Sequence, residues 1–306
     1  MSDPVSATNA NAPTLSESLS QAISQPNITK KIISLGKYHA AYWEMGHGQP
    51  LVFLHGFLGQ SLSWQPLLPL LAPDFHCIAL DLLGFGESSQ PSLKYVIDHQ
   101  VEFVTEFLAA LTTQGVNLEN FGLVGYSYGG WTAAALTIAQ AVNPFSKPPS
   151  KIHCHQLALV APAGIRDDQF VGRYDYLRPL LWESPLVDWT LAASKPVAKL
   201  LGRARKWQEI YRARQELQRQ PVAKSFLCDR LRPEDAIDTV ETKIHQINIP
   251  TVVVAGGQDT TIPLWHCETY GTKIPQARLH VLANADHDLI QTHTAELAAY
   301  LRQHFR

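Results

Sequence analysis

The clearest candidate for a reactive side chain in this chain is a serine between two glycines, in the stretch GYSYGG. The serine is Ser127, with Gly125 two residues before it and Gly129 two residues after it. The preceding NFGLV is typical of a buried strand, and the alanine-rich GGWTAAALTIAQAV that follows is typical of a helix. Glycines at these two positions avoid collisions in a sharp strand-to-helix turn. We therefore expect a strained backbone at Ser127, with the hydroxyl projecting from the turn as a candidate nucleophile.

A serine hydroxyl is a weak nucleophile unless a base accepts its proton and a third group orients that base. The chain has 13 histidines, so position has to discriminate among them. Functional groups in an open parallel sheet gather in loops beyond the carboxyl ends of strands. Asp259 lies just after the apolar run TVVVAGG, and His287 lies just after RLHVLAN. We therefore predict Ser127 as the nucleophile, His287 as the base and Asp259 as the acid that orients it.

Other histidines and aspartates fit these roles less well. Four histidines fall within expected strands or helices: His266, His280, His293 and His304. Asp286 and Asp288 flank His287 and are expected to be turn and cap residues. Asp81, in the tight turn DLLGFGES, is expected to have a structural role.

Attack on a carbonyl creates an oxyanion that needs hydrogen-bond donors already in place. We predict the backbone N–H of Tyr128, directly after the nucleophile, as one donor. The second is expected from LHGFLG, residues 54–59, and is assigned to the N–H of Phe57. Three further side chains would add apolar bulk to the substrate pocket: Leu58, Tyr126 and Trp131.

The elements that must position these residues alternate along the chain. Apolar runs typical of strands occupy about 37–46, 50–56, 75–86, 120–124, 155–164, 249–263 and 277–289. Amphipathic or alanine-rich segments typical of helices occupy 96–115, 129–142 and 294–305. This alternation predicts an α/β fold with a mostly parallel, doubly wound sheet.

The domain organisation follows from where this alternation breaks. We predict a core of residues 31–165 and 247–306, interrupted by a helical lid over residues 166–246. Residues 1–30 are rich in Ser, Asn, Ala and Gln and are expected to be mobile.

The composition limits the possible partners. The net charge of −2 and the pI of about 6.7 give no reason to expect nucleic acid. The sequence has no run of 18 apolar residues and no secretory signal, which favours a cytoplasmic location. The four cysteines are far apart and are interpreted as free thiols: Cys77, Cys154, Cys228 and Cys267. We expect no cofactor and no metal.

Taken together, HGFLG, DLLGFGES, GYSYGG, GGQDTTIP and ADHDL resemble the α/β-hydrolase fold superfamily in order and spacing. The resemblance covers residues from about 37 to 306 and implies the triad and the oxyanion donors named above. Serine as nucleophile, in place of aspartate, argues against the haloalkane dehalogenase and epoxide hydrolase branches. Tyr126 stands where carbon–carbon bond hydrolases of the family often carry Asn, which disfavours that branch without removing it.

The resulting prediction is a serine hydrolase, esterase- or lipase-like, that cleaves a carboxylic ester with a hydrophobic acyl or alcohol group through an acyl-enzyme. One alternative is a carbon–carbon bond hydrolase or an acyl transferase that uses the same triad. An alternative of another class is a non-catalytic ligand receptor on the same fold.

The segment 197–220 combines seven basic residues, two acidic residues and two aromatic rings. Six of its residues roughly follow one helical face, which predicts one helix: Leu200, Ala204, Trp207, Tyr211, Arg214 and Leu217. A basic amphipathic helix with Trp and Tyr can lie on an anionic membrane surface. A helix packed on the core with a solvated cationic face is the simpler interpretation. Peripheral contact with an anionic membrane through residues 197–220 is the alternative interpretation of this segment.

Overall fold

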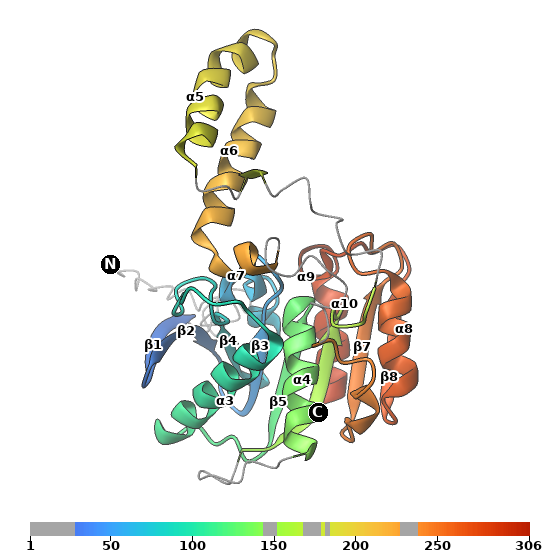
Figure 1. Cartoon of the computed structure of the whole chain (residues 1–306). Helices are drawn as coiled ribbons and strands as arrows, with labels where there is room; N and C mark the ends of the chain where they lie inside the picture. Colours follow the sequence, from blue (N-terminus) through green and yellow to red (C-terminus); the bar gives the residue numbers. More distant parts are fainter. Residues whose placement is uncertain (1–27, 143–151, 168–178, 181–183, 227–237) are drawn as a thin grey trace, which may run out of the picture.

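The computed structural model describes residues 28–142, 152–167, 179–180, 184–226 and 238–306. A sheet in the order β1-β2-β4-β3-β5-β6-β7-β8 runs through the molecule (Figure 1). β2 pairs antiparallel with β1 and β4, and the pairs from β4 across to β8 are parallel. The strands are β1 (Thr29–Leu35), β2 (Tyr38–Met45), β3 (Gln49–Leu54), β4 (Phe75–Leu80), β5 (Phe121–Tyr126), β6 (Cys154–Val160), β7 (Thr251–Gly256) and β8 (Ala277–Leu282).

Helices cover both faces of this sheet. The helices in the described residues are η1 (Ser61–Trp64), α2 (Leu68–Leu71), α3 (Ile97–Thr113), α4 (Tyr128–Val142), α5 (Pro185–Leu200), α6 (Ala204–Arg219), α7 (Pro221–Lys224), η5 (Ile244–Gln246), α8 (Leu264–Lys273), α9 (Leu289–Thr292) and α10 (Thr294–Phe305), of which α5 and α6 do not lie on the sheet. Alternate residues of β3 belong to two separate cores. Val52 packs into the core that contains α3 and α4, and Phe53 into the one that contains α2 and α10. The predicted mostly parallel, doubly wound α/β sheet is confirmed.

The central strands form because both of their faces are buried. β7, TVVVAG, is buried at every position, as expected for a β-branched run between two helical layers. The same apolar composition made these strands visible in the sequence.

Strand β1 was not predicted, because it lies at the sheet edge and most of its residues are exposed. Leu35 pairs with Tyr38 across a two-residue connection in which Gly36 has φ +72°. Such a turn favours a hairpin, and the GK pair between two strand-like runs was the available signal. The sheet therefore begins at Thr29, slightly before the predicted core boundary at residue 31.

The described parts of 166–246 are helical and contain no strand. α5 and α6 form an antiparallel pair, here called the hairpin, which stands off from the rest of the molecule (Figure 1). The expectation of one helix over 197–220 is wrong, because α5 ends at Leu200 and α6 begins at Ala204. Gly202, with φ +68°, makes the reversal between them.

The base of the hairpin joins the core. α7 follows α6 directly, and Val222 of α7 is fully buried in the core that contains α3 and α4. Ile244 of η5 is buried in the same core. The division into core and helical lid stays a prediction. Of the four cysteines, Cys228 lies outside the described residues, and the others are buried free thiols: Cys77, Cys154 and Cys267.

One half-buried histidine contributes to a pH dependence of stability. Burial, together with the positive field of Arg278 and His155, lowers the pKa of His304 in α10 to about 4. A histidine in the unfolded chain has a pKa of about 6.5. Below that pH the unfolded chain binds a proton that the folded chain does not bind until about pH 4, which favours unfolding. We expect the melting temperature to fall between pH 6.5 and 4, and His304→Gln to remove part of that fall. Thermal denaturation of both proteins across this range tests it; His245→Gln, at an exposed site, should leave the decrease unchanged.

Candidate active site

Ser127 stands at the corner where β5 ends and α4 begins. Its φ of +52° lies in the left-handed region that non-glycine residues rarely adopt. A Cβ on Gly125 would lie 2.4 Å from the carbonyl oxygen of Gly129, and one on Gly129 would lie 2.1 Å from that of Leu54. The steric reason for both glycines and the strained conformation of the serine are confirmed.

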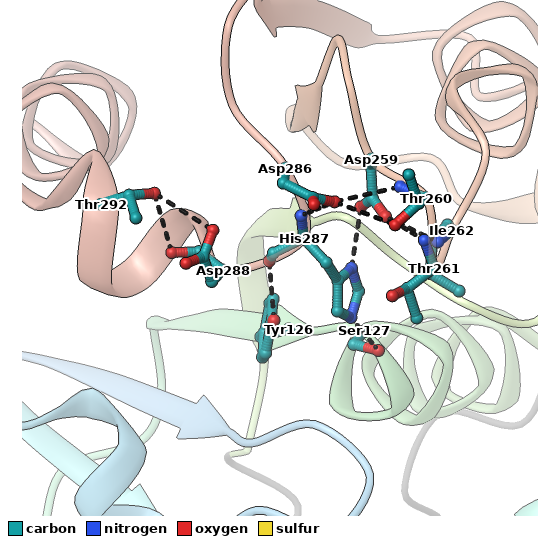
Figure 2. A network of polar contacts seen from close by, with 10 residues as sticks. All are labelled: Tyr126, Ser127, Asp259, Thr260, Thr261, Ile262, Asp286, His287, Asp288 and Thr292. Carbon is teal, nitrogen blue, oxygen red and sulfur yellow. Dashed lines mark hydrogen bonds and ion pairs between the residues drawn. The ribbon is translucent and has the colours of Figure 1, made fainter.

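Three side chains predicted from separate parts of the sequence meet in space. His287 Nε2 is 3.0 Å from Ser127 Oγ, and His287 Nδ1 is 2.8 Å from Asp259 Oδ2. Figure 2 shows the imidazole ring lying between the hydroxyl and the carboxylate. This geometry fits a hydroxyl that gives its proton to Nε2 while the carboxylate holds Nδ1 in its protonated form.

The carboxylate of Asp259 is fixed by its own loop. Its other oxygen accepts hydrogen bonds from the N–H groups of Thr261 at 2.8 Å and Ile262 at 2.7 Å. The side chain is 1% exposed, so water does not compete for it. The carboxylate therefore stays in place for His287.

Asp286 and Asp288 do not contact the ring of His287. Asp286 accepts from the backbone N–H of Thr260 at 3.0 Å and of His287 at 2.7 Å, which ties the loops after β7 and β8 together (Figure 2). These two N–H groups lower the pKa of the Asp286 carboxyl. Asp288 stands at the start of α9, with Thr292 against it. The turn role expected of Asp286 is confirmed, whereas Asp288 occupies the N-cap position of α9 without a capping hydrogen bond from its side chain.

Tyr126 acts on His287 directly. Its hydroxyl donates to the carbonyl oxygen of His287 at 2.7 Å, and the two rings pack at a tilt of 32° with their centroids 5.1 Å apart. Burial raises the pKa of the Tyr126 phenol well above its ordinary value, so it remains a donor. Tyr126 was predicted as a pocket residue, and the structure places it as a support for the histidine.

The loop after β3 lies against the serine. A Cβ on Gly56 would be 3.2 Å from the Cβ of Ser127. The carbonyl oxygen of Gly56 accepts from His55 Nδ1 at 2.8 Å and from the N–H of Gly59 at 3.0 Å. His55 is fully buried, and its Nε2 accepts from the N–H of Leu82 at 3.0 Å. Burial lowers the pKa of His55, so the ring stays neutral with its hydrogen on Nδ1.

This arrangement orients the peptide between Gly56 and Phe57. In a trans peptide the N–H points away from the carbonyl of the same unit. Two donors on the Gly56 oxygen therefore fix the direction of the Phe57 N–H. His55 was not singled out in the sequence, although it precedes the predicted donor by two residues.

An aromatic cluster lies beside the corner. The ring of Phe57 packs edge-on against Tyr128, with their centroids 6.1 Å apart, and Tyr128 packs against Trp131 at 5.9 Å. Phe226, just after α7, contacts all three, at 5.3 Å from Phe57 and 5.4 Å from Tyr128. Phe226 was not singled out in the sequence, because it lies about 100 residues from the nucleophile in a segment without a motif.

Leu58 lies in the loop after β3 and borders a cavity. It has φ +58°, is 40% exposed and lines a cavity of about 460 Å³ whose lining does not include the serine or the histidine. The other residues that line it are Gly59, Gln60, Ser63, Gly86, Glu87, Gln90 and Gln220. The place of Leu58 in the substrate pocket stays a prediction.

Asp81 has the structural role expected of it. Its carboxylate accepts from the N–H of Ser61 at 2.6 Å and of Glu87 at 2.9 Å, joining the loops after β3 and β4. Of the other histidines, His280 lies in β8, His266 in α8 and His304 in α10, whereas His293 lies between α9 and α10. In the part of the chain that the structure describes, no cluster of His, Cys, Asp or Glu could hold a metal ion.

Comparisons with known proteins show the family of the chain. The family model for the alpha/beta hydrolase fold matches residues 49–294. A 2-hydroxymuconate semialdehyde hydrolase from Pseudomonas sp. (strain CF600) is 28% identical over 281 residues, covering 90% of this chain and 92% of the relative. A 2-hydroxy-6-oxo-6-(2'-aminophenyl)hexa-2,4-dienoic acid hydrolase from Metapseudomonas resinovorans is 22% identical over 284 residues, covering 90% of each chain.

A solved structure gives the same result for the fold. The 2-hydroxy-6-oxo-6-phenylhexa-2,4-dienoate hydrolase from Rhodococcus sp. strain RHA1 superposes with a TM-score of 0.67, at 19% identity, over 92% of this chain and 99% of its own. The family match spans most of the chain and contains all three residues of the Ser127–His287–Asp259 arrangement. The chain therefore belongs to the α/β-hydrolase fold family.

Proposed function

We propose that the protein is a serine hydrolase in which Ser127, His287 and Asp259 act as a catalytic triad. The observation that carries this is the pair of contacts of His287, 3.0 Å to the serine hydroxyl and 2.8 Å to the aspartate. The serine oxygen would attack a carbonyl carbon as its proton passes to Nε2 of His287. Collapse of the tetrahedral adduct gives an acyl-enzyme, and His287 returns the proton to the departing group. Water then releases the acid by the same steps.

The N–H groups of Phe57 and Tyr128 are proposed as the oxyanion donors. Gly56 packs against Ser127, and the Gly56 carbonyl is held by two donors, which supports the assignment of the Phe57 N–H. Tyr128 is the first residue of α4, where the helix dipole favours negative charge. Two such donors stabilise the charge that develops on the substrate oxygen.

The bond proposed for cleavage is a carbon–carbon bond next to a ketone, as in a 2-hydroxy-6-oxo-hexa-2,4-dienoate. This differs from the ester prediction made from the sequence. The support is that relatives with this named activity align over about 90% of both chains. In this reaction the departing group is a carbon, so the proton held by His287 must reach carbon in place of an alkoxide oxygen. The products are a carboxylic acid and a hydroxydienoate, and water is the co-substrate.

Ester cleavage remains the second candidate, because of the residues around the serine. Tyr126 replaces the polar Asn that carbon–carbon hydrolases often carry, and its hydroxyl is engaged with the carbonyl of His287. The rings of Phe57, Tyr128, Trp131 and Phe226 would suit a hydrophobic acyl group. An acyl transferase with the same triad would differ only in the acceptor of the acyl group.

The two candidates separate in a direct comparison of substrates. We expect kcat/KM for 2-hydroxy-6-oxo-6-phenylhexa-2,4-dienoate, followed by loss of its visible absorbance, to exceed that for p-nitrophenyl esters of short and long acyl chains. The opposite order would assign the protein to the esterases. A fluorophosphonate probe that labels the wild type but not Ser127→Ala would exclude the non-catalytic receptor, whereas a wild type that resists the probe would overturn the triad proposal.

The proposed substrate is a small, largely hydrophobic molecule, and a cytoplasmic location stays a prediction. Among the described helices, none is long and apolar enough to cross a membrane.

A further inference from the structure

The hairpin tip, residues 197–206, carries exposed apolar side chains. Val197 is 55% exposed, Leu200 87% and Leu201 63%. α5 has no buried residue along its 16 positions, so these side chains take no part in the core. Figure 1 shows the tip at the end of the hairpin farthest from the sheet. At 1.5 Å per residue, α5 extends about 24 Å.

Cations surround these apolar residues. The tip contains four exposed basic side chains: Lys199, Arg203, Arg205 and Lys206. One carboxylate, Glu209, lies a turn below and pairs with Arg205 at 3.3 Å. The tip is therefore strongly positive, although the whole chain has a net charge of −2.

The two helices are fastened to each other below the tip. Trp207 donates its Nε1–H to the carbonyl of Leu191 in α5 at 3.0 Å and stacks on Tyr211 at 5.1 Å. At the base, Arg214 is 1% exposed and pairs with Asp188 at 2.6 Å. These aromatic and basic residues hold the hairpin together and do not project as a membrane-facing surface. The tip, in contrast, is left projecting.

We propose that the hairpin tip inserts Val197, Leu200 and Leu201 into an anionic lipid surface while the four surrounding cations contact the headgroups. This revises the contact expected of residues 197–220, since the lower part of that segment is used within the hairpin. Apolar side chains ringed by Lys and Arg match the apolar boundary and the charged headgroup layer of such a membrane.

A lipid surface fits the tip better than a second protein does. Stable protein interfaces bury about 800 Å² per partner, and three side chains on a convex apex offer much less than that. A fluid bilayer adapts to such an apex without a complementary groove. The base of the hairpin continues into α7 and Phe226, beside Phe57 and Tyr128. Docking by the tip would therefore hold the candidate site at the opposite end of the hairpin, about the 24 Å length of α5 from the tip, whichever bond is cleaved.

Co-sedimentation of the full chain with vesicles tests the proposal. The wild type should sediment with vesicles of phosphatidylcholine and phosphatidylserine, but not with phosphatidylcholine alone. Binding should weaken as salt rises from about 0.1 to about 1 M, because the Debye length falls from about 10 to about 3 Å. Leu200→Ser with Leu201→Ser should reduce the bound fraction by about tenfold, since the apolar anchor is lost. A variant that combines Lys199→Gln, Arg203→Gln, Arg205→Gln and Lys206→Gln should reduce it similarly.

Val142→Ser is the matched control, because Val142 is 61% exposed at the end of α4, away from the hairpin. It should bind as the wild type does. Turnover of a soluble substrate, measured without vesicles, should be equal in all variants and keeps this test separate from that of the triad. The proposal is overturned if the wild type ignores anionic vesicles at low salt, or if the double leucine variant binds them unchanged. Sedimentation velocity that shows a dimer lost in the leucine variant would instead assign the tip to self-association.

Discussion

Replacing Ser127 with alanine should lower turnover by at least about ten-thousandfold, because triad members act as a unit and loss of the nucleophile removes the acyl-enzyme route. The fold should survive. The substitution deletes one hydroxyl that contacts His287 at 3.0 Å, and such a hydrogen bond contributes only about 1 kcal/mol to stability. The measurement is kcat/KM on the better substrate, together with thermal denaturation of the same preparation.

The matched control is Ser34→Ala, at an exposed position of β1 far from the site in the sheet order. It should keep the activity of the wild type. A Ser127→Ala protein that retains more than about a tenth of the rate would rule out Ser127 as the nucleophile. A Ser127→Ala protein that loses activity and also unfolds would contradict the expectation that the substitution removes catalysis but leaves the fold stable.

Gly129→Ala should cost more than about 3 kcal/mol of unfolding free energy, the upper end for overpacking an interior. Its Cβ would lie 2.1 Å from the carbonyl oxygen of Leu54 and 2.5 Å from that of His55. Both obstacles are backbone atoms of the adjacent loop, so no side chain can rotate away to relieve them. The midpoint of chemical denaturation measures the loss.

Gly115→Ala adds the same atom where nothing lies within 4 Å, but at φ +91°. It should cost about 1–2 kcal/mol, the strain of a left-handed conformation alone. The comparison separates steric collision from backbone strain. Equal losses in the two variants would show that the contact between α4 and the loop after β3 is not the reason for a glycine at position 129.

The parts of the site that follow directly on strands could be predicted from the sequence. Ser127, Asp259 and His287 each come after an apolar run, and parallel strands deliver their carboxyl ends to one edge of the sheet. The glycines at 125 and 129 could also be interpreted, because a sharp strand-to-helix turn leaves no room for a side chain at these positions. Local sequence and global fold agree at these positions.

Features that depend on tertiary packing could not be predicted. Tyr126 reads as an apolar pocket residue until the loop after β8 places the carbonyl of His287 against its hydroxyl. Phe226 joins the aromatic cluster only because α7 folds back onto the core. The break at Gly202 was missed because a helical periodicity continued across it. Glycine within a helical pattern is tolerated often enough that its presence alone does not predict the end of a helix.

The strand order has a consequence for how the protein becomes active during synthesis. Ser127 follows β5, Asp259 follows β7 and His287 follows β8, so the histidine must find a partner 160 residues earlier in the chain. Contacts between such distant residues form late, because strand pairing must first offset the entropy cost of closing a long loop. A ribosome-bound chain that ends before β8 would carry its serine without its base. Hydrolytic activity should therefore appear only when nearly the whole polypeptide has been released and the last strand has joined the sheet.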